Sequence, residues 1–150
     1  MRVKVNPENY LFVEFPSNSC NEALARSMIA CFAAQLDPTL DELGDIKTAV
    51  CEAVTNCIVH AYPDSIGKIT MKAQILQDRV LDIVIRDKGA GISDIEQARQ
   101  PMFTTGGSER SGMGITIMES FMTTVKITSA VGKGTTVHMR KTLRRRGPKR

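Results

Sequence analysis

Residues 39–60 read TLDELGDIKTAVCEAVTNCIVH, and this segment predicts one long amphipathic helix that organises the fold. Thr39 opens the helix and Glu42 follows three residues later, which is the spacing of a capping box. Pro63, directly after Tyr62, ends it. Apolar residues recur along it at spacings of three and four and predict a buried stripe: Ile46, Val50, Ala53, Val54, Cys57 and Ile58.

Glu52, Asn56 and His60 lie four residues apart in the same segment, so they share a helix face beside the apolar stripe. The side-chain oxygen of Asn56 is a hard ligand of the kind that Mg²⁺ accepts together with water and phosphate oxygens. Glu52, one turn earlier, can take a proton from an attacking hydroxyl group or water. Taken alone, the same residues would equally suit a solvated helix surface.

The flanking segments alternate between helix and strand patterns. Pro16 follows the aromatic and β-branched run YLFVEF, and Ser17 or Ser19 can cap a helix that runs to about Leu36. The other predicted elements are the strands Lys68–Leu76 and Val80–Arg86, a helix Met113–Met122, and the strands Val125–Ser129 and Thr135–Leu143. Together they predict an α/β (α+β) domain, a two-layer sandwich with helices on one face of a mainly antiparallel sheet.

Two glycine-rich blocks follow the hairpin. In DKGAG, Asp87 ends a strand and two glycines allow close backbone approach, as needed to receive the exocyclic amine of a purine. In SGMG, residues 111–114, the glycines open a helix, where free N–H groups and the helix dipole attract phosphate. Arg110 stands just before it and can add a charged contact to a terminal phosphate. Taken alone, D-x-G-x-G is also an ordinary turn sequence.

Length and composition indicate one domain: 150 residues, 42% of them apolar and 24% charged. We expect a cytosolic protein, since neither a membrane-spanning run nor a signal peptide is evident. The four cysteines have no zinc-like spacing, and we expect them to be small buried side chains in the reduced state. Seven of the 20 basic residues lie between Arg140 and Arg150, which leaves 13 against 16 acidic residues. Residues 144–150 therefore read as a basic, disordered tail on a domain of residues 1–143.

The order of the blocks is more specific than any one of them. A helical E-x-x-x-N, a strand-end D-x-G-x-G, a loop, G-x-G at a helix start and then G-x-G-T (132–135) resembles the GHKL superfamily of ATPases and kinases across residues 10–143. Within it, the strings EAVTN, IRDKGAGI, ARQPMFTT and ERSGMGITIMESFM resemble the sporulation anti-sigma F family of serine kinases. The resemblance implies that the stretch from about Ile92 to Arg110 is the ATP lid of the family, but its centre, residues 104–108, departs from the family pattern and is shorter.

This resemblance assigns roles to the residues. It implies ATP or ADP with Mg²⁺ as the ligand, Asn56 as the metal ligand, and Glu52 and Arg110 as catalytic residues. It implies nucleotide contacts from Asn56, Asp87, Gly89, Gly91, Ile92, Thr104, Thr105, Ser111, Gly112, Met113, Gly114 and Thr135, and a partner contact from Arg26. The partners it implies are a sigma factor of the sigma F type and an anti-anti-sigma protein that is phosphorylated on serine. A homodimer is expected, with no membrane and no direct nucleic-acid contact.

Two other functions remain open on the residues alone. The chain could be a binding module without enzymatic activity, in which bound ATP or ADP only sets the affinity for a partner. It could also bind nucleic acid through its basic tail, but its aromatic content of 5%, without tryptophan, offers little for base stacking. The kinase hypothesis explains the most residues, because it gives a task to Glu52 and Arg110 as well as to the pocket.

Overall fold

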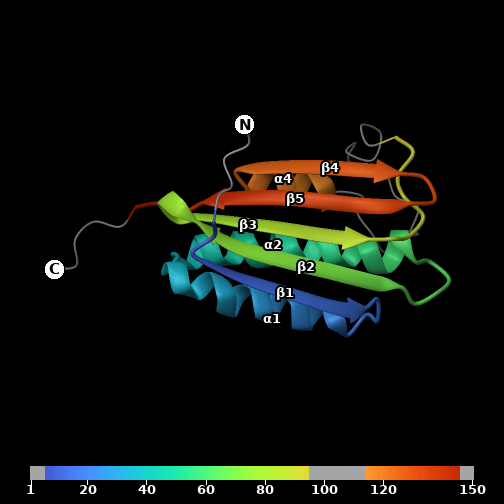
Figure 1. The fold of residues 1–150 in the computed structure, drawn as a ribbon, viewed down its shortest axis with the longest axis horizontal. Coiled ribbons are helices and arrows are strands. Elements are labelled where there is room, and N and C mark those ends of the chain that lie inside the picture. Colours follow the sequence, from blue (N-terminus) through green and yellow to red (C-terminus); the bar gives the residue numbers. More distant parts are fainter. Residues whose placement is uncertain (1–5, 95–113, 146–150) are drawn as a thin grey trace.

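The computed structural model describes residues 6–94 and 114–145, which form two layers (Figure 1). Five strands make one sheet in the order β1-β2-β3-β5-β4, and each neighbouring pair is antiparallel. The strands are β1 (Asn9–Pro16), β2 (Lys68–Leu76), β3 (Val80–Asp87), β4 (Thr124–Ala130) and β5 (Gly134–Thr142). The helices α1 (Asn21–Ala33), α2 (Leu40–Asn56) and α4 (Gly114–Phe121) cover one face of this sheet. The predicted two-layer α/β (α+β) sandwich is confirmed.

Helix α2 begins as its sequence predicts. The hydroxyl of Thr39 accepts a hydrogen bond from the backbone N–H of Glu42, and the Glu42 carboxylate accepts one from the N–H of Thr39. Of the predicted stripe, all but Ile58 are buried. The last turn differs from the prediction, because Cys57–Ala61 forms a π-helical turn, η2. Such turns are rare and often lie at functional sites.

The start of α1 corrects a prediction. Neither Ser17 nor Ser19 caps the helix through its side chain: the N-cap residue is Cys20, which has helical backbone angles and makes no capping bond. The hydroxyl of Ser17 is instead buried and accepts a hydrogen bond from the backbone N–H of Gly67, 2.9 Å away. It thus joins the end of β1 to the residue just before β2. A 3₁₀ turn, η1 (Ala34–Leu36), extends α1 to the predicted end.

The β2–β3 hairpin turns through η3 (Gln77–Arg79), in which Asp78 and Arg79 have φ angles of 62° and 61°. Two successive residues with positive φ match the right-handed twist of the strands that they connect. The resulting register pairs Leu76 with Val80 and Ile69 with Asp87. Asp87 therefore lies at the last position of β3, at the end of the sheet where α2 also ends (Figure 1).

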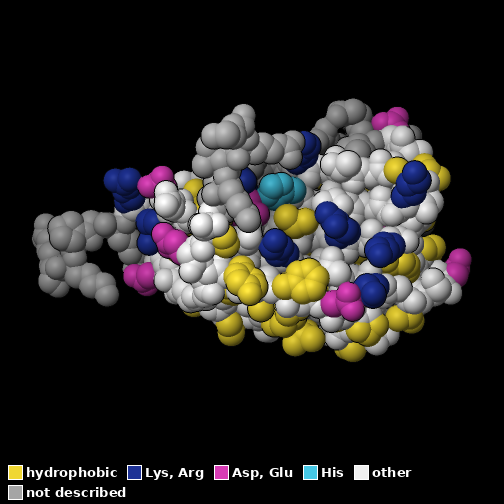
Figure 2. Space-filling model, viewed as in Figure 1, with side chains coloured by type: hydrophobic (Ala, Val, Ile, Leu, Met, Phe, Trp, Pro, Cys, Tyr) yellow, Lys and Arg dark blue, Asp and Glu magenta, His cyan; other side chains and the backbone are white. Residues whose placement is uncertain are grey.

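The core lies between the helices and the sheet. Alternate residues of β2 and β3, among them Met71 and Ile83, are fully buried against α1 and α2. Figure 2 looks onto the opposite sheet face, where lysine and arginine side chains are spread over the strands. On that face Tyr10 and Phe12 are 66% and 58% exposed. None of the helices that the structure describes is long and apolar enough to cross a membrane.

The expectation of four buried cysteines is wrong for two of them. Cys57 is buried and Cys51 is half-buried, but Cys20 and Cys31 are exposed. Cys20 precedes the first turn of α1, and Cys31 lies on the rim of a surface groove between α1 and α2 rather than against the sheet. The sequence of α1 has small or apolar residues on several faces, so its pattern did not separate the buried face from this rim.

Candidate nucleotide site

The carboxylate of Asp87 is buried at the end of β3, with 5% of the residue exposed. Its Oδ1 atom accepts hydrogen bonds from the backbone N–H groups of Gly89 and Thr135, at 2.9 and 3.1 Å. Its Oδ2 atom accepts the thiol of Cys57 at 3.4 Å. Burial, together with the charge of Asp87, raises the pKa of this thiol, so the thiol stays protonated and donates. A carboxylate oxygen can accept two bonds, so Oδ2 can receive a further donor such as a purine amine.

The turn that follows Asp87 is held on both sides by backbone hydrogen bonds to Ala90. On one side the N–H of Ala90 donates to the carbonyl of Ala61, the last residue of η2, at 2.9 Å. On the other side the carbonyl of Ala90 accepts the N–H of Gly132, in the β4–β5 turn, at 2.8 Å. The π-helical turn therefore ends with a carbonyl that has no partner within the helix and instead bonds to the DKGAG block.

Two glycines of this block are required by space and backbone angle. A Cβ atom on Gly89 would lie 2.3 Å from the carbonyl oxygen of Ala61. Gly91 has a φ angle of +77°, and a Cβ there would lie 2.3 Å from the carbonyl oxygen of Ala130. The prediction that these glycines allow close backbone approach is confirmed, and the groups that they approach are the carbonyls of Ala61 and Ala130.

Side chains that were not predicted also shape this end of the site. The hydroxyl of Tyr62 donates to the carbonyl of Lys68 and accepts the N–H of Lys88, at 2.8 and 2.7 Å. The hydroxyl of Ser129 accepts the N–H of Ile92 at 2.7 Å and lies 2.8 Å from the hydroxyl of Thr135. From the sequence, Tyr62 with Pro63 predicts only the end of a helix. The signal in the sequence that could have indicated this role is the position of Tyr62 between η2 and the DKGAG block.

Glu52 and Asn56, both half-buried, lie at the second part of the candidate site, against the first residue of α4. A Cβ atom on Gly114 would lie 3.0 Å from Oε2 of Glu52 and 3.3 and 3.4 Å from the side-chain nitrogen and oxygen of Asn56. The first and third sequence blocks are thus in contact. The N-terminus of a helix carries partial positive charge and free N–H groups, which favour the Glu52 carboxylate and a bound phosphate alike.

His60 does not simply continue the column of Glu52 and Asn56. It lies in η2, where the backbone hydrogen bonds connect residues five apart, so a spacing of four no longer places it directly above Asn56. Within residues 6–94 and 114–145, no group of three or more histidine, cysteine, aspartate or glutamate side chains forms a candidate metal centre. A cation here would depend on Asn56 and on the oxygens of a ligand and water.

Several predicted residues cannot be placed. Thr104, Thr105, Arg110, Ser111, Gly112 and Met113 lie outside the described residues. Ile92 and Thr135 lie beside the Asp87 turn, as the preceding contacts require. Arg26 lies apart from both sets of contacts, on α1, where it is exposed and pairs with Glu22 at 3.5 Å. It lines the α1–α2 groove together with Lys47.

Comparison with known proteins identifies relatives of the whole fold. The model of the histidine kinase-like ATPase domain family matches residues 15–141. The anti-sigma F factor of Caldanaerobacter subterraneus subsp. tengcongensis is 54% identical over 134 residues, which are 89% of this chain and 93% of the relative. The anti-sigma F factor of Bacillus licheniformis is 50% identical over 137 residues, 91% of this chain and 94% of the relative.

Solved structures agree on the fold. The RsbU and RsbW domains of a Mycobacterium tuberculosis protein match 93% of this chain with a TM-score of 0.68 and 19% identity, over 34% of that chain. A histidine kinase domain from an Erythrobacter litoralis blue-light activated histidine kinase matches 81% of this chain and 61% of its own, with a TM-score of 0.57 and 19% identity. At these identities the likeness concerns the fold alone.

Proposed function

Because the chain belongs to the histidine kinase-like ATPase family and, within it, to the anti-sigma F factors, we propose that it is an ATP-dependent protein serine kinase that also inhibits a sporulation sigma factor. The observation that carries the proposal is the contact between Gly114 and the Glu52–Asn56 pair. It brings a candidate proton acceptor, a candidate metal ligand and a helix N-terminus to one place. Phosphoryl transfer needs these three elements together.

The residues present fit a nucleotide with its cation. Asp87 has a carboxylate oxygen that can take an amine donor, and the glycines beside it let the backbone of three chain segments pack closely around that carboxylate. Ile92 and Thr135 line the same end. Asn56 offers one hard oxygen, and Mg²⁺ commonly uses one or two protein ligands and takes the rest from phosphate and water. When bound there, the cation would neutralise charge on the phosphates.

In this proposal Glu52 is the general base. It would take the proton from the serine hydroxyl of the protein substrate while the serine oxygen bonds to the terminal phosphorus and ADP leaves. Arg110, Thr104, Thr105 and the backbone of residues 111–113 would contact the phosphates, as the family resemblance implies. Gly114 allows the base to approach the start of α4 without a side chain between them.

The experiment is a transfer assay with the purified chain, Mg-ATP and an anti-anti-sigma protein, followed by mass spectrometry of that protein. We expect a mass gain of one phosphate, located on serine. Glu52→Ala should lower the transfer rate at least about 10²-fold while Mg-ATP affinity stays within about threefold. Transfer at the wild-type rate in Glu52→Ala would remove the base role. A wild-type chain that binds ATP and the partner but transfers nothing would favour the non-enzymatic nucleotide-switched module.

For the sigma factor, we propose that Arg26 is a contact residue. It is exposed on α1 and lines the same groove as Lys47, and two basic side chains in one groove suit an acidic partner segment. A homodimer with the sigma factor bound to it is part of the same proposal. Arg26→Ala should weaken binding to a sigma F type factor about tenfold without changing Mg-ATP affinity. Lys126→Ala, which removes a charge on β4, is the control, and equal sigma binding by both variants would contradict the assignment.

A further inference from the structure

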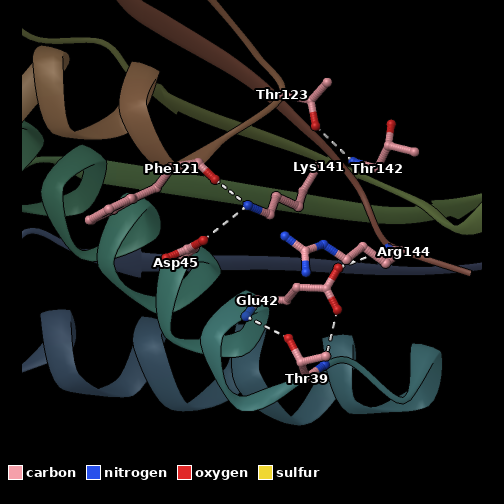
Figure 3. A network of polar contacts seen from close by, with 8 residues as sticks. All are labelled: Thr39, Glu42, Asp45, Phe121, Thr123, Lys141, Thr142 and Arg144. Carbon is pink, nitrogen blue, oxygen red and sulfur yellow. Dashed lines mark hydrogen bonds and ion pairs between the residues drawn. The ribbon is translucent and has the colours of Figure 1, made fainter. Parts of the chain in front are cut away.

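The side chain of Lys141, in β5, lies between α2 and the C-terminal end of α4 (Figure 3). It is only 15% exposed, and its ammonium group lies 3.1 Å from Oδ2 of Asp45 on α2. The same nitrogen donates to the backbone carbonyl of Phe121, the last residue of α4. A positive charge at this position complements the partial negative charge at a helix C-terminus. Lys141 thus connects the end of α4 to α2 and to the sheet.

Two hydrogen bonds next to Lys141 also hold the end of α4 against β5. The N–H of Thr123 donates to the carbonyl of Arg140 at 2.8 Å, and the N–H of Thr142 donates to the hydroxyl of Thr123 at 2.9 Å. These bonds fix the chain that leaves α4 onto β5. Lys141 adds the one ionic contact in this group that reaches across to α2.

The other end of α4 lies at the candidate site. Gly114 is in contact with Glu52 and Asn56, while Phe121 is joined through Lys141 to Asp45. The separation from Asp45 to Glu52 equals that from Gly114 to Phe121, seven residues or about 10 Å of helix at 1.5 Å per residue. Helix α4 therefore runs antiparallel along α2, and the contacts at its two ends share one register.

We propose that Lys141 is a positioning residue for the phosphate end of the site: it sets where the N-terminus of α4 stands relative to Glu52 and Asn56. This inference rests on the proposed function, since it takes that helix N-terminus to face the phosphates. An eight-residue helix has little stability of its own, so its position depends on tertiary contacts at its ends. Without the ammonium group, α4 can shift along α2, and the Asp45 carboxylate loses its partner.

Calorimetry and ligand-observed NMR test this with two ligands, Mg-ATP and adenosine. Lys141→Met should lower Mg-ATP affinity about tenfold and leave adenosine affinity unchanged, because adenosine depends on the Asp87 end alone. Lys141→Arg keeps the charge and should return Mg-ATP affinity to within about threefold of wild type. Asp45→Asn, a milder variant, should reduce Mg-ATP affinity in the same direction. Amide exchange in residues 114–121 should be faster in Lys141→Met.

Thr39→Ala is the matched control, because it removes the α2 cap in the same region without touching α4. It should lower the melting temperature but alter neither affinity. Unchanged Mg-ATP affinity in Lys141→Met, or an equal fall in the affinities for Mg-ATP and adenosine, would overturn the positioning role. Failure of the wild-type chain to bind Mg-ATP would instead overturn the proposed function, and the inference with it.

Discussion

At the scale of single residues, glycines allow the close backbone packing at the Asp87 end of the site. Gly89 and Gly91 press against the carbonyls of Ala61 and Ala130, and a Cβ on Gly134 would lie 2.2 Å from the carbonyl oxygen of Asp87. Three segments distant in sequence therefore approach one another at backbone distance around one carboxylate. Small changes of volume here move backbone atoms rather than flexible side chains.

Gly89→Ala should therefore impair nucleotide binding. The added Cβ must displace the turn from Ala61, which breaks the bond from the N–H of Ala90, at a cost of about 1–3 kcal/mol in stability. We expect at least a tenfold loss of ATP affinity, in line with the about 1.4 kcal/mol that a factor of ten represents. The measurement is isothermal titration calorimetry.

Gly44→Ala is the control for this substitution. Gly44 is exposed in the interior of α2, and a Cβ there would meet nothing within 4 Å. Alanine should stabilise the helix by about 0.5–1 kcal/mol and leave ATP affinity unchanged. Equal ATP affinities in the two variants would refute the account of the Gly89 contact.

At the scale of elements, the start of α2 is bonded to the chain that follows β5. Glu42 completes the capping box with Thr39, and its second oxygen accepts the backbone N–H of Arg144 at 2.9 Å (Figure 3). Burial alone would raise the pKa of Glu42, but the bonds from Thr39 and Arg144 outweigh it and hold the pKa below its usual value of 4.5. The capping box was predictable from spacing, whereas the contact with a residue 102 positions away was not.

The free energy of unfolding should therefore depend on pH through the ionisation of Glu42. A lowered pKa means that the folded state favours the ionised carboxylate, so its contribution is complete well above pH 4.5 and is lost as the pH falls through the folded-state pKa. Glu42→Gln should cost about 1–2 kcal/mol at pH 7, and the gap to wild type should narrow below pH 4.5. Urea unfolding between pH 3.5 and 7 measures this. A gap that is constant over that range would contradict the assignment.

At the scale of the whole molecule, the described chain ends far from the candidate site. The register of β3 and β5 pairs Val80 with Thr142 and Arg86 with Thr136. Strand β5 therefore starts beside Asp87 and finishes at the opposite end of β3, beside Val80. The backbone of Arg144 still belongs to the fold, because its N–H and carbonyl bond to Glu42 and Arg79. Arg140 and Lys141, the first residues of the basic run, lie in β5, and the described chain ends at Arg145, at the end of the sheet away from the Asp87 turn (Figure 1).

The sequence predicted the parts of this structure that depend on local pattern. Strand alternation located all five strands to within about two residues, and the spacing of Thr39 and Glu42 located the start of α2. The predictions failed where contacts between residues distant in sequence determine the role or the burial of a side chain. The hydroxyl of Ser17 has a tertiary partner in place of a cap, and Cys20 and Cys31 are exposed rather than buried. The roles of Tyr62 and Lys141 depend on neighbours that only the folded chain brings together.

We propose above all that Asn56 marks the metal and phosphate end of a nucleotide pocket whose other end is Asp87. The most direct test is the calorimetric affinity for ATP, with Mg²⁺ and with a chelator, in the wild-type chain and in Asn56→Ala. We predict that the wild type binds ATP more tightly with Mg²⁺, and that Asn56→Ala binds about tenfold more weakly and no longer responds to Mg²⁺. An Asn56→Ala variant with wild-type affinity and the same response to Mg²⁺ would contradict the account.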